Sequence, residues 1–409
     1  MIRILPLLLL LISFNIQADS WIQKSNLTAP GRGGIPFSFV INGMAYFGCG
    51  NAPNGSNPNL LQDFWQYNPV TDIWTQKANF GGVARWGPIG FSLNGKGYAG
   101  LGGDYTNMNG LLQDFWEYDP AANSWTQKAN FVGGPLNYAA SFTINNKGYV
   151  TNGYSYNPLL FIHSQLWEYD AITDSWTQKA SYPGIAIRDV ACFSIGSKGY
   201  IGTGLDNITG ARHNDFWEYN SINDQWTQKA SFPGALRCDA TGLSIANKGY
   251  IGFGQDLPFT FFNDFWEYDP PTDTWTQKLS LPAGVRNEGV KFTVNDKGYI
   301  VSGLVDNIQT VYNDVWEYIP DEVTTGINMI DSLSIVSIFP NPFTNQLNIN
   351  STTTEPKELI LRDGLSKLIL LQSFKHSINL NTSSMASGIY YFEIRNSQRT
   401  ILSGKLLKQ

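Results

Sequence analysis

The sequence has few charged residues, few cysteines and no long basic run. Only 15% of its 409 residues are charged, and the formal net charge is −6. We therefore expect no nucleic-acid partner. The three cysteines (Cys49, Cys192 and Cys238) are odd in number and far apart, so neither a disulfide framework nor a CxxC metal knuckle is predicted. We interpret at least two of them as small buried residues.

Several catalytic motifs are also missing. The sequence contains no GxSxG, no P-loop and no HExxH. Two of its three histidines, His163 and His213, lie four residues before Trp167 and Trp217. No third ligand has a suitable spacing, so we expect no metal, and nothing in the sequence indicates a cofactor.

The N-terminus reads "MIRILPLLLLLISFNIQADS" and is typical of a secretory signal peptide. Arg3 supplies the positive start, residues 5–12 form an apolar block, and Ala18 is a plausible cleavage position. A membrane anchor is the alternative, but the block is shorter than the roughly 20 residues that span a bilayer. We predict a signal peptide over residues 1–18 and no transmembrane segment after its removal.

Aromatic residues and glycines are abundant, and they recur at a regular spacing. Tryptophans before Gln-Lys are separated by 53, 51, 51, 50 and 49 residues. They are Trp21, Trp74, Trp125, Trp176, Trp226 and Trp275. A second series is Trp65, Trp116, Trp167, Trp217, Trp266 and Trp316, and a third is Tyr98, Tyr149, Tyr200, Tyr250 and Tyr299, with Tyr46 as a looser sixth member. A period near 50 residues with strand-like content favours a propeller over a helical solenoid.

Each repeat holds four short strand-like runs separated by turn residues, as residues 188–229 show. Four antiparallel strands form one propeller blade. Trp21 belongs to a fourth strand without the preceding three, whereas the last repeat has three strands and no fourth. We therefore predict an all-β, six-bladed propeller over residues 19–320, closed by an N-terminal strand at residues 21–25.

The repeats resemble the Kelch family. The resemblance rests on the Tyr and Trp spacing and on glycines after the second strand, namely Gly102–Gly103, Gly202 with Gly204, and Gly252 with Gly254. Most repeats have Gly-x-Gly where that family usually has Gly-Gly. The third and sixth repeats keep only Gly153 and Gly303.

A different composition follows the repeats. Residues 321–335 read as a linker, and residues 336–409 alternate polar and apolar residues, as a small β-sandwich does. Phe339-Pro340-Asn341-Pro342-Phe343, "LRDGLSK" and "MASGIYYFEI" resemble the C-terminal sorting domain of type IX secretion cargo in Bacteroidetes. That resemblance implies a secreted or cell-surface protein, the type IX machinery as a partner, and a domain that is removed or exchanged for an anchor. A structural or carbohydrate-binding sandwich is the alternative.

Function is sought where the repeats differ, near the start of each innermost strand on the axial face. Five of the six repeats have arginine there, and a ring of guanidinium groups could hold a carboxylate or an acidic sugar. Trp86 and Tyr138 could form a stacking surface for a sugar ring. In the alternative reading, the arginines brace neighbouring blades and Asp189, Asp239 and Glu288 are their partners. The candidate ligand-binding residues are Arg85, Trp86, Asn137, Tyr138, Arg188, Asp189, Arg237, Asp239, Arg286 and Glu288.

Two other groups of residues were weighed. Apolar loop tips that a partner could cover contain Tyr156, Leu159, Phe161, Phe259, Phe261 and Phe262. Carboxylates that recur in five of the six repeats are interpreted as structural; they are Asp63, Asp114, Asp215, Asp264 and Asp314, and Glu117, Glu168, Glu218, Glu267 and Glu317.

Together these observations predict a glycan- or protein-binding module rather than an enzyme. One alternative is an enzyme that acts on an acidic sugar at the axial face, as the periplasmic Kelch sialic-acid mutarotases do. Another is an adhesion or scaffold protein that uses the loop tips.

Overall fold

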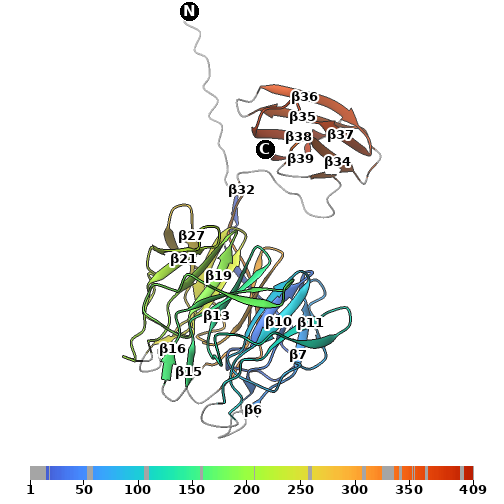
Figure 1. The fold of residues 1–409 in the computed structure, drawn as a ribbon. Helices are drawn as coiled ribbons and strands as arrows, with labels where there is room; N and C mark the ends of the chain where they lie inside the picture. The colour runs from blue at the N-terminus through green and yellow to red at the C-terminus, as the bar shows by residue number, and fades with distance from the viewer. Residues whose placement is uncertain are drawn as a thin grey trace, which may run out of the picture. The chain divides into compact units, whose positions relative to one another are not determined.

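The computed structural model describes most of the chain. The described residues are 15–17, 19–52, 59–105, 110–156, 160–206, 208–256, 260–305, 310–324, 336–339, 343–351, 353, 355–363, 367–396 and 400–408. Every regular element among them is a β-strand (Figure 1). No helix in this part of the chain is long and apolar enough to cross a membrane. The predicted signal peptide and linker lie mainly outside the described residues.

The chain divides into two compact units. One is Ala18–Asp321, and the other combines Met1–Gln17 with Glu322–Gln409. In the second unit β1 (Asn15–Gln17) pairs antiparallel with β32 (Glu322–Thr324).

The first unit contains six four-stranded antiparallel sheets, which we number by the chain position of their innermost strand. Sheet 1 consists of β3 (Phe37–Ile41), β4 (Met44–Gly48), β7 (Phe64–Asn68) and β8 (Ile73–Gln76). Sheet 2 consists of β9 (Ile89–Leu93), β10 (Lys96–Gly100), β11 (Phe115–Asp119) and β12 (Ser124–Lys128). Sheet 3 consists of β13 (Ala140–Ile144), β14 (Lys147–Thr151), β17 (Leu166–Asp170) and β18 (Ser175–Lys179). Sheet 4 consists of β19 (Ala191–Ile195), β20 (Lys198–Gly202), β21 (Phe216–Asn220) and β22 (Gln225–Lys229). Sheet 5 consists of β23 (Thr241–Ile245), β24 (Lys248–Gly252), β27 (Phe265–Asp269) and β28 (Thr274–Lys278). Sheet 6 consists of β29 (Val290–Val294), β30 (Lys297–Val301), β31 (Val315–Ile319) and β2 (Ser20–Lys24).

The innermost strands contact one another in a closed cycle, β3, β9, β13, β19, β23, β29 and back to β3. Repeated antiparallel sheets arranged in this way are consistent with a β-propeller. Short hairpins occur in three of the loops between second and third strands. They are β5 (Asn51–Ala52) with β6 (Asn59–Leu60), β15 (Tyr154–Tyr156) with β16 (Leu160–Ile162), and β25 (Gln255–Asp256) with β26 (Thr260–Phe261).

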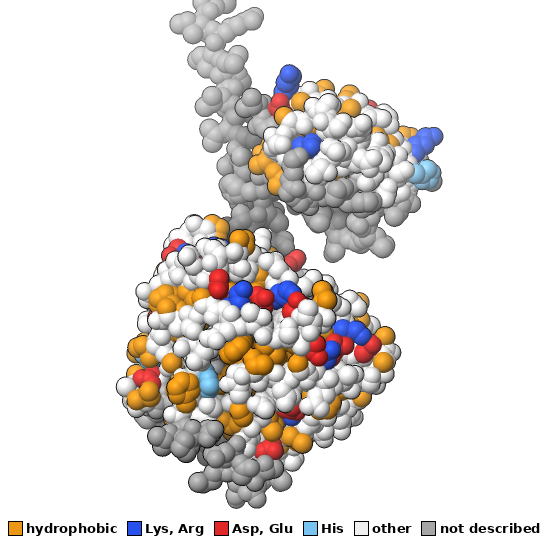
Figure 2. Space-filling view, viewed as in Figure 1, with side chains coloured by type: hydrophobic (Ala, Val, Ile, Leu, Met, Phe, Trp, Pro, Cys, Tyr) orange, Lys and Arg blue, Asp and Glu red, His pale blue; other side chains and the backbone are white. Residues whose placement is uncertain are grey.

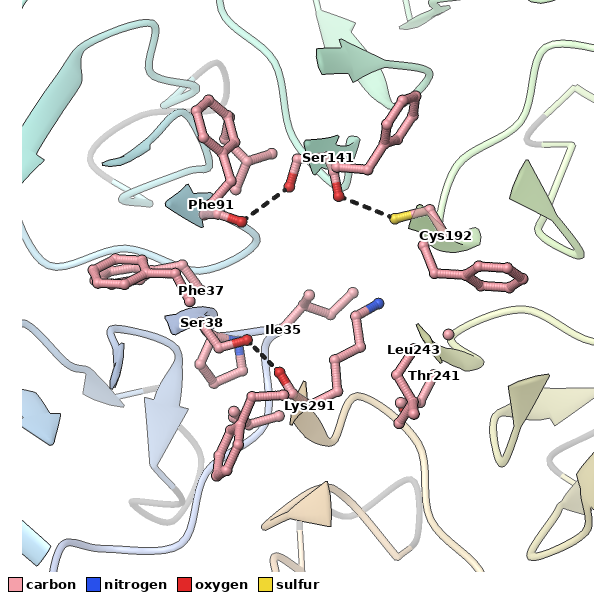
Figure 3. Close-up of a pocket in the computed structure, with 18 of the residues that line it drawn as sticks. Ile35, Phe37, Ser38, Phe91, Ser141, Cys192, Thr241, Leu243 and Lys291 are labelled. Carbon is pink, nitrogen blue, oxygen red and sulfur yellow. Dashed lines mark hydrogen bonds between the residues drawn. The ribbon is translucent and has the colours of Figure 1, made fainter. Parts of the chain in front are cut away.

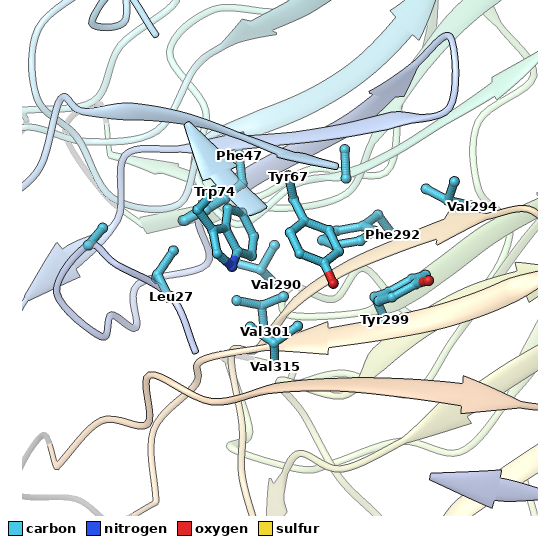
Figure 4. Packing of buried hydrophobic residues seen from close by; sticks show 12 residues of the cluster. Leu27, Phe47, Tyr67, Trp74, Val290, Phe292, Val294, Tyr299, Val301 and Val315 are labelled. Atoms are coloured by element: carbon cyan, nitrogen blue, oxygen red, sulfur yellow. The ribbon is translucent and has the colours of Figure 1, made fainter. Parts of the chain in front are cut away.

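Large aromatic side chains fill the space between neighbouring sheets. Between sheets 6 and 1, Trp74 and Tyr67 pack against Phe292 and Tyr299 in one buried cluster (Figure 4). Similar clusters lie between the other neighbouring pairs. Each Trp and Tyr buries about 150–250 Å², so one sheet alone cannot cover its faces and the repeat has to recur.

The same polar contacts join every pair of neighbouring sheets. The indole nitrogen of each outer-strand tryptophan donates to a backbone carbonyl that follows the outer strand of the preceding sheet. The six bonds are Trp21 to Leu279, Trp74 to Ser25, Trp125 to Ala78, Trp176 to Ala129, Trp226 to Ala180 and Trp275 to Ala230.

The first strand of this unit completes its last sheet. β2 pairs with β31, with Trp21 opposite Tyr318. The carboxylate of Asp19 accepts hydrogen bonds from the Leu279 backbone N–H at 2.7 Å and from the Tyr318 hydroxyl at 3.1 Å. Asp72, Asn123, Asp174, Asp224 and Asp273 accept equivalent backbone bonds between the other pairs of sheets. The contacts around the N-terminal strand that completes the last sheet are therefore of the same kind as the contacts between the other neighbouring sheets.

Lysines on the outside of the sheets pair with carboxylates of the repeat. The pairs are Lys96–Asp119, Lys147–Asp170, Lys198–Glu218, Lys248–Asp269 and Lys297–Glu317. Basic and acidic side chains accordingly lie next to one another on the face seen in Figure 2.

The C-terminal part of the second unit contains two sheets. One has three strands, β33 (Val336–Phe339), β34 (Gln346–Ser351) and β37 (Ser377–Asn381). The other has four, β36 (Leu368–Phe374), β35 (Lys357–Asp363), β38 (Gly388–Arg395) and β39 (Thr400–Lys408). Side chains from both sheets, such as Ile349 and Leu359, share one buried cluster.

Candidate functional site

A cavity of about 300 Å³ lies at the centre of the ring of innermost strands. The second residues of these strands line it: Ser38, Gly90, Ser141, Cys192, Gly242 and Lys291. Ser38 Oγ donates to the Lys291 carbonyl at 2.6 Å, and Cys192 Sγ donates to the Ser141 carbonyl at 3.3 Å. The Lys291 side chain extends into the open space (Figure 3). The described residues give its amine no ion-pair partner.

The residues before the innermost strands form a ring at one end of the cavity, which we call the mouth ring. All six have positive φ: Gly34 (70°), Gly87 (64°), Tyr138 (52°), Asp189 (56°), Asp239 (56°) and Glu288 (55°). This conformation suits glycine and strains other residues. Sheets 1 and 2 have glycine there, whereas sheets 3 to 6 have Tyr138, Asp189, Asp239 and Glu288 at the cost of strain. Strained non-glycine residues of this kind cluster at functional sites.

Backbone hydrogen bonds fix the mouth ring. The Asp239 N–H donates to the Asp189 carbonyl at 3.0 Å, and the Glu288 N–H donates to the Asp239 carbonyl at 3.4 Å. On the other side, the Gly87 N–H donates to the Gly34 carbonyl at 2.8 Å. The side chains on the ring are therefore held by a rigid frame.

Three carboxyl groups occupy consecutive positions of the ring. Asp189 forms an ion pair with Arg188, and Glu288 Oε2 accepts from the Gly34 N–H at 2.5 Å. Asp239 Oδ2 accepts from Gln255 Nε2 at 2.8 Å. Together with Tyr138, these carboxyl groups line the cavity.

Burial and the closeness of the carboxyl groups to one another raise the pKa values of side chains at the mouth. Burial, followed by the charge of Asp239, raises the pKa of Glu288 to about 8. Burial and the same neighbour raise the pKa of Asp189 well above its ordinary range. Burial and the nearby carboxylates, Glu288 foremost, also raise the pKa of Tyr138. The mouth therefore binds protons more readily than an exposed acidic patch does.

Aromatic rings form a continuous arc beside the mouth. We call this set, Tyr105, Trp86, Tyr138, Tyr154 and Tyr156, the aromatic arc. Trp86 stacks on Tyr105 with centroids 5.2 Å apart and meets Tyr138 edge-on at 5.0 Å. Tyr154 lies 6.0 Å from Tyr138 and 5.4 Å from Tyr156. Tyr105 and Tyr156 are 50% and 40% exposed, so both ends of the arc face solvent.

Two predicted residues support this arc. Arg188 lies over Tyr138 and Tyr154, 5.5 and 5.3 Å from their centroids. Asn137 is buried, and its Oδ1 accepts from the Tyr138 N–H at 2.8 Å. The indole nitrogen of Trp86 is buried without a hydrogen-bond partner among the described residues. Such a group is expected to meet water or a ligand.

A ligand-binding ring requires arginines that face the cavity. Three of the predicted arginines do not face it: Arg85, Arg237 and Arg286. All three are fully buried and none lines the cavity. Each binds an aspartate of its own sheet through two nitrogens, at 2.6 to 2.9 Å. The pairs are Arg85–Asp114, Arg237–Asp264 and Arg286–Asp314, with Arg32–Asp63 as a fourth. These arginines therefore brace their own sheets and not neighbouring ones, and their partners are not Asp189, Asp239 or Glu288.

The Arg85–Asp114 pair shows how these arginine–aspartate braces work. Arg85 Nη1 also donates to the Leu101 carbonyl at 2.9 Å, and Asp114 accepts from the indole of Trp116 at 2.7 Å. Burial alone would raise the pKa of Asp114, but the hydrogen bonds and charge of Arg85 lower it below its ordinary value. The brace therefore joins the start of a sheet to its third strand.

Arg188 does not occupy the position of the other arginines. The pairing of Arg188 with Leu205 matches that of Trp86 with Gly103, which places Arg188 one residue later. Ile187 fills the buried position in sheet 4, and Leu136 fills it in sheet 3. The expected set of five equivalent arginines is therefore a set of four, and Arg188 is a mouth residue.

The loop-tip residues are only partly at tips. Phe161 and Tyr156 are exposed, but Phe262 lies 4.2 Å from the guanidinium of Arg237 and covers it. Leu159 and Phe259 lie outside the described residues. His163 approaches Ser155 Oγ at 2.8 Å through Nε2. Among the described residues, no cluster of three His, Cys, Asp or Glu side chains could hold a metal ion, and the three cysteines are buried and unpaired.

Two members of the site were missed by the sequence reasoning, Tyr105 and Tyr154. Tyr105 lies in a variable loop with no spacing rule to mark it. Tyr154 follows Gly153, the glycine of the third repeat. Other repeats have Asn51, Gly103 or Leu205 at this position, so its aromatic character is the signal that could have identified it.

Comparisons with known proteins bear on both units. Residues 337–409 match the family described as "Secretion system C-terminal sorting domain". This domain marks the chain as a protein that is secreted or anchored at the cell surface, and it implies interaction with the type IX secretion machinery. No curated protein matches this chain.

The fold of the repeated sheets has a solved counterpart. A structure titled "Structure of YjhT" is similar, with a TM-score of 0.59 and 17% sequence identity. The match covers 72% of this chain and 96% of that chain. At this identity the likeness extends to the fold alone.

Proposed function

We propose that this chain is a secreted or cell-surface, six-bladed Kelch propeller that binds a glycan at the mouth of its axial cavity. The C-terminal β-sandwich would deliver it by type IX secretion of the Bacteroidetes kind, after removal of a signal peptide over residues 1–18. The sixfold sheet contacts and the match at residues 337–409 support this assignment.

The observation that carries the proposed ligand class is the aromatic arc beside three inward-facing carboxyl groups. A sugar presents C–H faces that pack on aromatic rings and hydroxyl groups that donate hydrogen bonds. Trp86 and Tyr105 supply the rings, and Asp239 and Glu288 supply acceptors. Ligand pockets commonly combine apolar walls with a few fixed polar groups.

The geometry does not favour the acidic sugar expected from the arginine series. Four arginines are saturated by aspartates, and Arg188 pairs with Asp189. A carboxylate ligand at the mouth would meet Asp239 and Glu288 instead of a ring of free guanidinium groups. We therefore propose a glycan without acidic groups at the contacted residue.

An enzymatic role is a second candidate, favoured by one observation. Burial and the Asp239 charge raise the pKa of Glu288 to about 8, within the range that suits proton transfer near neutral pH. A mutarotase-like reaction would change the ligand, whereas a binding module would leave it unaltered. The two candidates are thus separable by following the ligand over time.

The test uses the full chain and a panel of soluble oligosaccharides: cello-, xylo- and chitin oligomers, deacetylated chitin oligomers and oligogalacturonate. Thermal shift identifies a binding sugar, and NMR of that sugar over hours tells binding from turnover. We expect Trp86→Ala and Tyr105→Ala each to weaken binding about tenfold, equivalent to about 1.4 kcal/mol. Phe161→Ala, on the exposed β15–β16 hairpin, is the matched control.

Two results would contradict the proposal. One is full affinity of Tyr105→Ala for the sugar found, since this half-exposed residue can be removed without disturbing the core. The other is loss of binding in Phe161→Ala alone, which would place the contact at the loop tips.

A further inference from the structure

The mouth ring is divided into two chemically different halves. Sheets 1 and 2 contribute Gly34 and Gly87, which have no side chains. Sheets 4, 5 and 6 contribute Asp189, Asp239 and Glu288 in succession. Ile35, Pro36 and Pro88 line the cavity beside these glycines, so a ligand seated on the ring would meet apolar groups on one side and carboxyl oxygens on the other.

Each of these carboxyl groups uses one oxygen for a bond within the protein. Asp189 Oδ2 bonds to Arg188, Asp239 Oδ2 to Gln255, and Glu288 Oε2 to the Gly34 N–H. The second oxygens of all three accept no hydrogen bond from the described residues. Asp189 Oδ1 is the clearest case, because it is completely buried while its residue is only 4% exposed and lines the cavity. Because Asp189 Oδ1 is buried, the acceptors open to a ligand are the second oxygens of Asp239 and Glu288.

Among the described residues, Asp189 is paired with Arg188, whereas Asp239 and Glu288 have no ion-pair partner. Arg188 is engaged with Asp189 and lies over Tyr138 and Tyr154. Arg212 Nε lies 3.8 Å from Asp256. Lys291 is three residues further along its strand than Glu288, about 10 Å at 3.3 Å per residue, and extends into the cavity.

We propose that the mouth selects glycans that bear a free, protonated amino group. An ammonium group has N–H donors and a positive charge, which match the second oxygens of Asp239 and Glu288 on one side of the ring. Because the pKa of Glu288 is raised to about 8, binding of an ammonium group at pH 7 should be accompanied by release of the Glu288 proton. The sugar ring would pack on Trp86 and Tyr105, with its amine toward Asp239 and Glu288. Amino sugars such as glucosamine units meet these requirements, and their N-acetylated forms lose both the charge and two of the donors.

This inference rests on the proposed glycan-binding function and adds the charge of the ligand. The experiment compares glucosamine tetramer, N-acetylglucosamine tetramer and galacturonate tetramer by calorimetry with the full chain at pH 7. We expect glucosamine tetramer to bind at least tenfold more tightly than its acetylated form, and galacturonate tetramer to bind most weakly. The preference should shrink as salt is raised, because part of it is Coulombic.

Asp239→Asn identifies the source of the preference. It keeps the size of the side chain and removes its charge, so the amine preference should fall to about threefold or less. Asp269→Asn, on β27 of the same sheet, pairs with Lys248 away from the mouth and is the control; it should leave both affinities unchanged. Thermal unfolding of each variant verifies that it is folded.

The outcomes separate the two proposals. Equal affinity for the glucosamine and acetylated tetramers would overturn the amine inference and leave glycan binding intact. An unchanged preference in folded Asp239→Asn would also overturn it. Absence of binding by all sugars tested would overturn both.

Discussion

Sheets 1, 2, 5 and 6 differ from sheets 3 and 4 in one buried contact. The first group is braced by an arginine and an aspartate, as Arg85 and Asp114 show. In sheet 3 these positions hold Leu136 and Gln165, and in sheet 4 the arginine position holds Ile187. The two unbraced sheets are the ones that contribute Tyr138, Tyr154 and Arg188 to the mouth. The braced sheets 2, 5 and 6 contribute Trp86, Asp239 and Glu288, so the candidate site draws on both groups of sheets.

The unbraced sheets compensate for the missing arginine in two ways. Sheet 3 replaces the charged partner as well, since Gln165 is neutral and leaves no buried carboxylate unpaired. Sheet 4 keeps Asp215, which accepts from the hydroxyl of Tyr182 at 3.1 Å and from the indole of Trp217 at 2.8 Å. The other sheets have Phe or Leu where sheet 4 has Tyr182.

The largest expected effect comes from breaking one brace. Arg85→Ala leaves the Asp114 carboxylate half-enclosed without its cation, and we expect a loss of about 3–5 kcal/mol in the free energy of unfolding. Urea unfolding followed by tryptophan fluorescence measures it. Arg395→Ala, in an exposed pair with Glu358, is the control and should cost under about 1 kcal/mol. A loss below about 1 kcal/mol for Arg85→Ala would show that the braced and unbraced sheets are energetically alike.

A double replacement tests whether sheet 3 is a workable alternative to a brace. Arg85→Leu with Asp114→Gln copies Leu136 and Gln165 into sheet 2. Because a buried ion pair can be replaced by apolar or neutral groups with little cost, we expect the double variant to regain at least half of the stability that Arg85→Ala loses. If it is less stable than Arg85→Ala, the surroundings of the two sheets, and not the pair itself, decide the difference.

The mouth should make stability depend on pH in a way that the braces do not. The pKa of Glu288 is raised to about 8 by burial and by Asp239, with Arg188 and the Gly34 N–H acting in the opposite direction. The folded state therefore holds a proton that the unfolded state releases above about pH 4.3. The contribution of Glu288 to stability is greatest below that value and falls as the pH rises toward 8, by at most about 1.4 kcal/mol per pH unit.

Glu288→Gln should flatten this slope. Melting temperatures between pH 5 and pH 9 measure it for the variant and the unaltered chain. Asp189 also has a raised pKa, so part of the slope should remain. An equal slope in both proteins would show that Glu288 does not titrate in this range. Glu393→Gln, on β38 of the other unit, is a suitable control.

Much of the architecture follows from the sequence because the repeat is spelled out by large residues. Counting repeats predicts that an N-terminal strand at residues 21–25 completes the last sheet, and β2 (Ser20–Lys24) pairs with β31, nearly 300 positions later. Their position before the innermost strands also predicts Tyr138, Asp189, Asp239 and Glu288 near the axis, and these four line the cavity, whereas Trp86 does not.

The role of the arginines did not follow, because one residue of register decides it. Arg32, Arg85, Arg237 and Arg286 lie five residues after Leu27, Phe80, Phe232 and Leu281, and Arg188 lies six residues after Tyr182. A shift of one residue moves a side chain from the buried side of the chain to the mouth. Burial and pairing depend on three-dimensional packing that composition and spacing do not contain.

The Asp19 contacts have a consequence for the order of folding. Asp19 and Tyr318 are 299 residues apart, yet their hydrogen bond belongs to the sheet that shuts the ring. A pairing of such long range is entropically costly unless the chain between its ends is already ordered. Docking of β2 is therefore expected to be the final and slowest event, preceded by an open intermediate in which the edge of β31 is unpaired. A chain whose synthesis stops before residue 315 would have no partner for its first strand.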